Sequence, residues 1–482
     1  MECKLQIFRH HCFSSVLLCA ITCIFDKCNC LFAQFVSKIS RNIFYTDRRN
    51  NVLDLGTNNN HKIEKGIIAL NSFLGWSREI DMNYNPPIDA ERLRKHYTRT
   101  LRDDKVLMTG HSHRAWPDRI VEGQMRAVEI AFREVDEKWE KTIFTYIIPE
   151  FQIGVAQRIG TDKPDHIAFG ENTHELVTRV LSSFPWDKST RVVTTNAEFH
   201  SSRREVTRLQ ENGVEVEYVP VQDRNTLCDR IRDAITPGTN AVIMSTVFFT
   251  DGSVLQNIDQ CIERAREVNA TVILDVYHQF NARRLKADEL GRDIFLTAGG
   301  YKYASAGEGC AWLKVPEICT MRPSNTGWFA DFSALKGKYP NPIRYGDGGQ
   351  RFLGATKDIS GMCRQIEVFR FMDEQGLTVD RLEKTDLHQT AYMIYLFDNL
   401  GVHQHGAVLR SSRNDVERGP FLAIDLETEE RAENVDRKLR QEYRVFADTR
   451  ESVLRMGPAP YTTEYELEYA MQSLKKVVSG EK

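Results

Sequence analysis

Four short runs rich in β-branched residues, separated by amphipathic stretches, constrain the fold of this chain more than any other feature of its sequence. The runs are RVVTT (191–195), EVEYVPV (215–221), AVIMSTVFF (241–249) and TVILDV (271–276). The stretches between them, such as RREVTRLQENG ending at Gly213, carry apolar residues at helical spacing. This alternation predicts an α/β fold with a mostly parallel sheet and helices on both faces. Such sheets bind ligands at the carboxyl ends of their strands.

The pattern changes from about Arg364 onward. Two helical stretches are followed by the strand-like runs FLAIDL, YRVFAD and VLRMG and by a closing helix, which predicts a smaller α+β domain. A chain of 482 residues also exceeds the usual length of one domain. We therefore expect an N-terminal extension over 1–81, a large ligand-binding domain over 82–360 that starts with an arm over 82–118, and a small domain over 361–482.

The first 81 residues differ from the rest in composition. Six of the 11 cysteines fall within the first 30 residues, and the other five are scattered singly from Cys228 to Cys363, which predicts a reduced, cytoplasmic body. The apolar run 12–25 is shorter than a membrane span but has the length of a signal-peptide core, so a targeting signal stays an alternative. The polar stretch after it predicts a loose extension, with Met82 as an alternative start.

Charge and metal-ligand spacing narrow the range of partners. The formal net charge is −3, from 64 basic and 67 acidic residues, so no overall field favours nucleic acid or a membrane surface. The CNC motif at 28–30 lacks a second ligand pair at zinc-like spacing, so we expect no metal. A small molecule is the expected partner.

An acid and a lysine stand out as chemical groups. Asp275 ends the run TVILDV, where a buried charge is costly unless a cation meets it. Lys302 lies in GGYKYASAGEG, where small neighbours bring the backbone close and exclude water, which would lower the pKa of the amine and prepare it to attack an aldehyde. A carboxylate for a pyridine nitrogen and a lysine for an aldehyde define a pyridoxal phosphate site. The alternatives are a helix-capping acid and a surface lysine.

The stretch 273–313, ILDVYHQFNARRLKADELGRDIFLTAGGYKYASAGEGCAWL, carries a family resemblance. It resembles the cofactor region of fold-type I pyridoxal-phosphate enzymes of the class V aminotransferase group, and within that group is most similar to kynureninases. The resemblance implies a seven-stranded-type sheet, a homodimer, and pyridoxal 5'-phosphate as cofactor. It also implies that Lys302 binds the cofactor covalently, that Asp275 meets the pyridine nitrogen, and that His278 helps to hold the ring.

Further cofactor residues follow from the same resemblance. Asn172 and Thr173 precede the helix candidate ELVTRVLSSF, and a helix N-terminus offers amides to a phosphate, with the Tyr301 hydroxyl as another contact. Ordinary helix capping by Asn172 or Thr173 uses the same amides.

The resemblance implies that Phe199 stacks on the pyridine ring and that Trp328 reaches a phosphate across the dimer interface. It places Thr356 where kynureninases carry an asparagine near the substrate and cofactor.

The substrate side is expected around three residues. Arg455, in VLRMGPAPY, matches the arginine that grips the substrate α-carboxylate, a task suited to a guanidinium because it makes two parallel hydrogen bonds. His111 and His113 lie in the segment that faces the substrate in the family, where they either contact substrate or organise the loop.

The resemblance implies a hydrolase that cleaves the Cβ–Cγ bond of kynurenine or 3-hydroxykynurenine, giving an anthranilate and alanine in tryptophan catabolism. Two departures from the kynureninase pattern, Ser202 and Thr356, keep open another class V reaction, such as transamination, lyase chemistry or desulfuration. Desulfuration requires a nucleophilic cysteine, for which Cys363 is the candidate. A non-catalytic protein that keeps the fold is the remaining alternative.

Overall fold

The computed structural model describes residues 44–46, 52–54, 84–101, 105–332 and 341–481. The chain forms two compact units, Met1–Glu79 and Ile80–Lys482. In the first unit, β1 (Phe44–Thr46) pairs antiparallel with β2 (Val52–Asp54). The apolar run 12–25, the CNC motif and the alternative start at Met82 lie outside the described residues.

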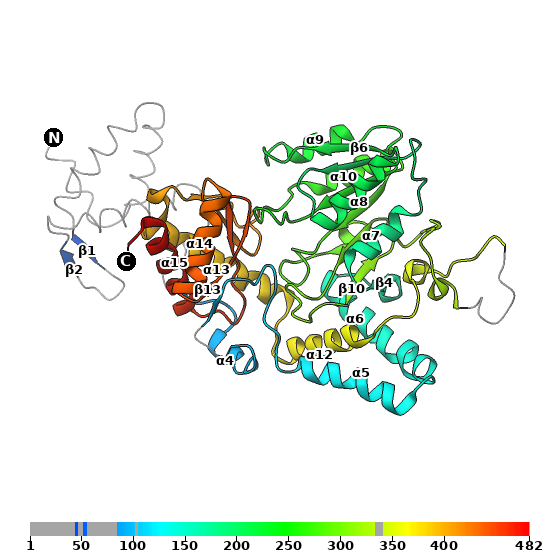
Figure 1. Cartoon of the computed structure of the whole chain (residues 1–482), viewed down its shortest axis with the longest axis horizontal. Helices are drawn as coiled ribbons and strands as arrows, with labels where there is room; N and C mark the ends of the chain where they lie inside the picture. Colours follow the sequence, from blue (N-terminus) through cyan, green and yellow to red (C-terminus); the bar gives the residue numbers. More distant parts are fainter. Residues whose placement is uncertain (1–43, 47–51, 55–83, 102–104, 333–340, 482) are drawn as a thin grey trace, which may run out of the picture. The chain divides into compact units, whose positions relative to one another are not determined.

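A seven-stranded sheet forms the centre of the second unit (Figure 1). Its spatial order is β4 (Ile167–Gly170), β10 (Ala311–Lys314), β9 (Phe295–Ala298), β8 (Thr271–Asp275), β7 (Ala241–Ser245), β5 (Arg191–Thr195) and β6 (Glu215–Val219). The pairs from β9 to β6 are parallel, and β10 is antiparallel to both of its neighbours. The predicted mostly parallel sheet is confirmed. Its inner strands read as continuous apolar runs because both faces are covered, whereas the edge strand β6 alternates exposed and partly buried residues.

Amphipathic helices flank this sheet. They are α5 (Ile120–Glu134), α6 (Ile148–Ile159), α7 (Thr173–Leu181), α8 (His200–Glu211), α9 (Leu227–Ala234), α10 (Ile258–Glu267), α11 (Ala287–Leu290) and α12 (Ser360–Glu374). Their burial follows helical spacing, as in α10, where Cys261, Ile262 and Ala265 are buried. Figure 1 shows α5 and α12 side by side, and the two helices are in extensive contact.

Apolar residues recur at helical spacing over 118–144, a pattern that predicts one helix, but the structure interrupts it. Val135 has a φ of 50°, in the left-handed region, and ends α5. The chain continues as a π-helix, η2 (Trp139–Ile147), which leads directly into α6. Shorter helical turns occur at α4 (Ala90–Arg94), η3 (Pro164–His166), η4 (Trp328–Ala330), η6 (Gly348–Phe352) and η7 (Val402–His405).

The C-terminal part is the predicted smaller α+β domain. Its antiparallel sheet has the order β11 (Val408–Leu409), β12 (Leu422–Asp425), β15 (Val453–Met456), β14 (Asp448–Arg450). The helices α13 (Val379–Asn399), α14 (Glu429–Glu442) and α15 (Glu464–Ser479) pack on it. The strand β3 (Val106–Leu107) pairs in parallel with β13 (Val445–Phe446), so the N-terminal arm shares the core of this domain.

Within the described residues, none of the helices combines the length and the apolar character that a bilayer crossing demands.

Candidate active site

The carboxyl edge of the large sheet brings Asp275 and Lys302 together. Asp275 is the last residue of β8, and Lys302 lies in the loop that follows β9, the neighbouring parallel strand. The Asp275 carboxylate accepts a hydrogen bond from the backbone amide of Tyr277 at 2.9 Å. Burial raises the pKa of Asp275, while this hydrogen bond and the charge of Lys302 oppose the rise. A cationic nitrogen placed at Asp275 would therefore stabilise its ionised form.

The amine of Lys302 is held in a water-poor position. Its side chain is 5 % exposed, and Nζ lies 2.9 Å from Nε2 of His278. Burial lowers the pKa of Lys302 to about 7, with Asp275 pulling in the opposite direction. The loop that carries Lys302 is closely packed, because a Cβ on Gly300, two residues earlier, would lie 2.3 Å from the sulfur of Cys310. Near neutral pH a large fraction of the amine is therefore free to act as a nucleophile or base.

His278 is a neutral partner for this amine. It is buried, and its Nδ1 lies 3.2 Å from the Tyr303 hydroxyl. Burial, reinforced by the charge of Lys302, holds the pKa of His278 well below its ordinary value. A neutral imidazole that accepts at Nε2 carries its proton on Nδ1, so the Tyr303 oxygen is the acceptor for that proton. His278 thus orients Lys302 without adding a charge.

Aromatic rings line the space around Nζ. The Lys302 amine lies 5.0 Å from the ring centre of Phe199 and 4.4 Å from that of Tyr277. Phe199 immediately precedes α8, and its ring packs edge-on against that of Phe249 at 5.3 Å. The ring of Tyr301 lies 5.0 Å from that of Tyr277. Flat apolar walls of this kind suit a planar heteroaromatic ligand.

Glu198 is a buried acid of this site that the sequence analysis did not single out. Its carboxylate accepts hydrogen bonds from the hydroxyls of Thr195 (2.7 Å) and Ser245 (2.5 Å) and from the Ser245 backbone amide. Burial raises the pKa of Glu198 to about 7; these donors oppose the rise and the charge of Asp275 adds to it. Ser245 pairs with Asp275 across β7 and β8, so Glu198 borders the Asp275 position. The sequence does not mark Glu198, because its partner Ser245 lies 47 residues further along the chain, on the neighbouring strand β7.

Asn172 and Thr173 begin α7, as the sequence predicts. The Asn172 side chain caps the helix by accepting a hydrogen bond from the Glu175 amide at 2.9 Å, and Thr173 is the first helical residue. Helix capping and anion binding use the same group of amides, so this geometry is compatible with a phosphate there.

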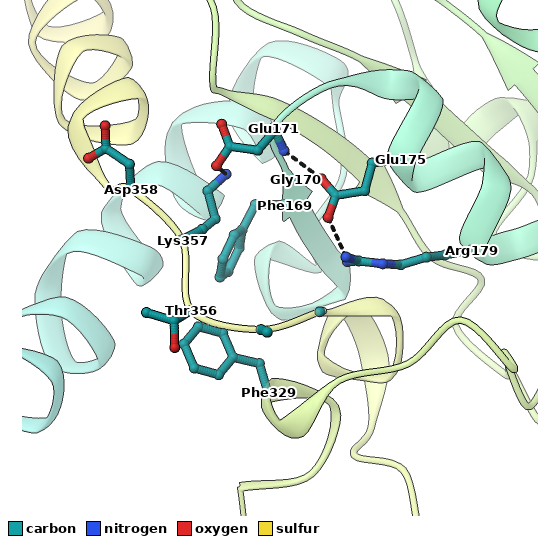
Figure 2. Close-up of a pocket in the computed structure, with 11 residues that line it drawn as sticks. Phe169, Gly170, Glu171, Glu175, Arg179, Phe329, Thr356, Lys357 and Asp358 are labelled. Carbon is teal, nitrogen blue, oxygen red and sulfur yellow. Dashed lines mark hydrogen bonds and ion pairs between the residues drawn. The ribbon is translucent and has the colours of Figure 1, made fainter.

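Thr356 lines a pocket of about 400 Å³ beside the start of α7 (Figure 2). Lys302 is not among the residues that line this pocket. Phe169 and Phe329 form its apolar walls, and Lys357 lies 3.5 Å from the carboxylate of Glu171. Trp328 is adjacent, 39 % exposed, with its ring against Phe329 at 4.2 Å. The structure thus groups Thr356 and Trp328 near the α7 start. The predicted role of Trp328 across a dimer interface and the predicted place of Thr356 near the substrate and cofactor stay predictions.

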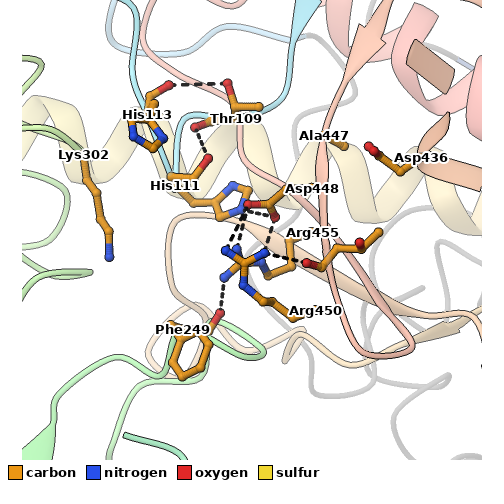
Figure 3. Close-up of polar contacts among 12 residues, drawn as sticks. Thr109, His111, His113, Phe249, Lys302, Asp436, Ala447, Asp448, Arg450 and Arg455 are labelled. Carbon is orange, nitrogen blue, oxygen red and sulfur yellow. Dashed lines mark hydrogen bonds and ion pairs between the residues drawn. The ribbon is translucent and has the colours of Figure 1, made fainter. Parts of the chain in front are cut away.

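Arg455 belongs to a charge cluster on the small sheet (Figure 3). Its guanidinium donates to both carboxylate oxygens of Asp448, at 2.8 and 2.7 Å, and to the backbone oxygen of Phe249 at 2.6 Å. Nε2 of His111 lies 2.9 Å from Asp448 Oδ1. Although burial opposes ionisation, these contacts hold the pKa of Asp448 below its ordinary range. Asp448 was missed by the sequence analysis, because only the pairing of β14 with β15 places it opposite Arg455.

The two histidines of the N-terminal loop lie in different environments. His111 is fully buried, its ring stacks on Phe421 at 4.7 Å, and burial lowers its pKa to about 4. His113 is 66 % exposed, and its ring stacks on Tyr301 at 5.0 Å. This geometry favours an organising role for His111 and leaves His113 accessible beside the cofactor-loop tyrosine.

The fold and the site define an enzyme that works with a buried lysine at the carboxyl edge of a mostly parallel sheet. The family profile of the class-V aminotransferases matches residues 137–406, more than half of the sequence. The chain belongs to this family, and membership of the family confirms the prediction of pyridoxal phosphate as the cofactor.

Curated relatives refine the comparison. The chain is 27 % identical over 150 residues to a probable cysteine desulfurase of Methanothermobacter thermautotrophicus, a match that covers 31 % of this chain and only 37 % of that protein. It is 22 % identical over 330 residues to a probable mitochondrial cysteine desulfurase of Dictyostelium discoideum, covering 67 % of this chain and 71 % of that protein. These relatives carry the name desulfurase, so they support class V and do not support kynureninase in particular.

Solved structures share the fold. A structure of C-DES with glycine linked to its pyridoxal phosphate has a TM-score of 0.68 at 16 % identity, covering 79 % of this chain and 98 % of that chain. A complex of the same cystine C–S lyase with its product, cysteine persulfide, has a TM-score of 0.67 at 16 % identity, covering 77 % and 97 %. At these identities the likeness concerns the fold alone.

The residues present fit the cofactor. Lys302 offers a buried amine of lowered pKa with a neutral partner, Asp275 a buried carboxylate, and Phe199 a ring above the same space. The α7 start adds amides that suit a phosphate. Within the described part of the chain, no group of three or more metal-ligating side chains is present.

Proposed function

We propose that this chain is a pyridoxal-phosphate enzyme that breaks the bond between Cβ and the next side-chain atom of an amino acid. The carrying observation is the buried Lys302 amine, 2.9 Å from a neutral His278 and with a pKa near 7. When bound, the cofactor accepts the electrons released at the substrate Cα. Lys302 is the base that takes the Cα proton, and His278 holds the Lys302 amine in place. Asp275 would keep the cofactor nitrogen protonated.

The position of Cys363 disfavours it as the nucleophile of a desulfurase mechanism. Cys363 is fully buried on α12, where a Cβ on Gly123 of α5 would lie 2.5 Å from the Cys363 backbone oxygen, so the residue lies in the contact between these helices. Burial raises the pKa of Cys363 to about 12 and that of the buried Cys310 to about 11. Un-ionised buried thiols are poor nucleophiles.

Two reactions fit these constraints. One is hydrolysis of kynurenine, in which water is consumed and anthranilate and alanine are formed, as the sequence resemblance favours. The other is elimination across the Cβ–S bond of cystine, in which cysteine persulfide leaves and water converts the remaining enamine to pyruvate and ammonia. C-DES is described as a cystine C–S lyase with cysteine persulfide as its product, and in our proposal this reaction needs no protein thiol. Both use the same lysine, and they differ in the side chain that leaves.

The test is turnover by the full chain loaded with pyridoxal phosphate. L-kynurenine, L-cystine and L-cysteine are supplied separately, and anthranilate fluorescence, new thiol or persulfide, alanine and pyruvate are measured. We expect turnover of kynurenine or cystine that survives Cys363→Ser and is lost in Lys302→Ala. Failure of the loaded enzyme on all three substrates, or loss of turnover in Cys363→Ser with the melting temperature unchanged, would overturn the proposal.

A further inference from the structure

Two cysteines face each other between α9 and α10 of the large domain. Cys228 lies at the start of α9, and Cys261 lies one turn into α10. Their Sγ atoms are 3.3 Å apart, and both residues are buried. Figure 1 shows the two helices next to each other, and they are in contact. Because a disulfide has an S–S distance of about 2.0 Å, the two sulfurs need to approach by only about 1.3 Å to form one.

Hydrogen bonding makes the two thiols chemically unequal. In the reduced pair, the Cys228 thiol donates to the backbone oxygen of Asn257 at 2.9 Å, so the Cys261 thiol is free to donate to the Cys228 sulfur. This bond from Cys261 lowers the pKa of Cys228, although burial opposes the change. The same bond, together with burial, raises the pKa of Cys261. Cys228 is therefore the thiol that ionises first and that attacks an oxidant.

The pair lies at the two ends of a segment that reaches the candidate active site. Residues 228–261 include β7 and the turn after it, where the ring of Phe249 packs against that of Phe199 at 5.3 Å. The Phe199 ring centre lies 5.0 Å from the Lys302 amine. A bond between the two sulfurs would close a loop that carries a ring in contact with one wall of the site.

We propose that Cys228 and Cys261 form a redox-active thiol pair, which hydrogen peroxide oxidises to a disulfide that joins α9 to α10. This inference does not depend on the proposed function. Peroxide is a small oxidant, which suits a pair in which Cys228 is 7 % exposed and Cys261 is fully buried. Because a disulfide restricts the unfolded chain more than the folded one, we expect the oxidised protein to be more stable.

The oxidation takes place in two steps. The Cys228 thiolate attacks one peroxide oxygen, the O–O bond breaks, and the departing hydroxide takes up the proton that Cys228 had lost, which leaves water and a sulfenic acid. The Cys261 sulfur then attacks the Cys228 sulfur, the S–O bond breaks, and the hydroxyl group leaves with the Cys261 proton as a second water. Two thiols are thereby oxidised to one disulfide and one peroxide is reduced to two waters. A small-molecule thiol reverses the change by disulfide exchange.

The test detects the bond in the folded, full-length chain. Reduced protein is treated with hydrogen peroxide in native buffer and, separately, in urea, then quenched with catalase, alkylated, digested without reductant and mapped by mass spectrometry. In native buffer we expect a cross-linked pair of peptides that contain Cys228 and Cys261 and have lost two hydrogen atoms. The melting temperature of the oxidised protein should rise by roughly 5 °C and return to its first value after treatment with dithiothreitol.

Cys228→Ser and Cys261→Ala should each lose both the cross-link and the rise in melting temperature. Cys319→Ser is the matched control, because Cys319 is half-buried and lies outside the closed loop, and it should keep both. A cross-link that is absent from native buffer, or that forms only in urea, would overturn the inference. So would a cross-linked protein that melts no higher than the reduced one, or a rise in melting temperature that persists in Cys228→Ser.

Discussion

Nζ of Lys302 lies 2.9 Å from Nε2 of His278, and both side chains are buried. The contact joins an amine whose pKa is lowered to about 7 to an imidazole that burial keeps neutral. A carboxylate in the place of His278 would instead favour the ammonium form and reduce nucleophilicity. The pairing therefore orients the lysine while a substantial fraction of it remains uncharged at neutral pH.

Replacing His278 by Phe should weaken pyridoxal phosphate binding roughly tenfold, because the variant keeps a ring but removes the acceptor at Nε2. The dissociation constant is measured by titrating cofactor-free protein and following absorbance. Tyr303→Phe removes only the second contact, at Nδ1, and should have a smaller effect. Equal affinity in wild type and His278→Phe would contradict the orienting role.

The rate at which cofactor-free protein binds pyridoxal phosphate should rise with pH around a midpoint near 7. Below the pKa of Lys302 the amine is protonated and cannot attack, and above it the amine is free. An ordinary lysine would give a midpoint near 10.4. Since the charge of Asp275 raises the pKa of Lys302, Asp275→Asn should move the midpoint lower. Stopped-flow absorbance gives the profile, and a wild-type midpoint above about 9 would be inconsistent with a desolvated lysine.

The buried ion pair between Arg114 and Asp386 should dominate the stability of the contact between the N-terminal loop and α13. Both side chains are 2 % exposed, and Nη2 of Arg114 lies 3.0 and 2.8 Å from the two carboxylate oxygens. Asp386→Ala leaves a buried guanidinium unpaired and should lower the free energy of unfolding by about 3–5 kcal/mol.

The control for the buried pair is an exposed ion pair on α5. Glu129→Ala removes the partner of Arg133 on α5, where the side chains are 47 % and 77 % exposed, and should cost less than about 1 kcal/mol. Urea denaturation midpoints compare the two variants. Similar midpoints for Asp386→Ala and wild type would show that the buried pair contributes little.

Four of the seven strands of the large sheet (β5, β6, β7 and β8) were predictable because each is a short run rich in β-branched residues. The strands β4 (IAFG), β9 (FLTA) and β10 (AWLK) are shorter and poorer in such residues, and they were not predicted. RVVTT corresponds to β5, and TVILD to β8, with the acid Asp275 at the strand end. The break at Val135 was not predictable, because the apolar spacing continues across it into the π-helix at 139–147. Periodicity reports the buried face of a helix and not the backbone angle of one residue.

The site was predictable to the extent that its residues lie in local motifs. Lys302, Asp275 and His278 occur in one stretch of the sequence, and the structure brings them together around the Lys302 amine. Glu198 and Asp448 gain their meaning from partners on other strands. Strand pairing creates these contacts, and one sequence does not display it.

The most direct test of the account is to locate the cofactor on the chain. The purified full-length protein is incubated with pyridoxal phosphate, reduced with borohydride, digested and mapped by mass spectrometry. We expect a pyridoxyl group on the peptide containing Lys302, together with a visible absorbance band that is absent in Lys302→Ala. A label on another lysine, or an unchanged band in Lys302→Ala, would contradict the assignment of Lys302 as the cofactor lysine.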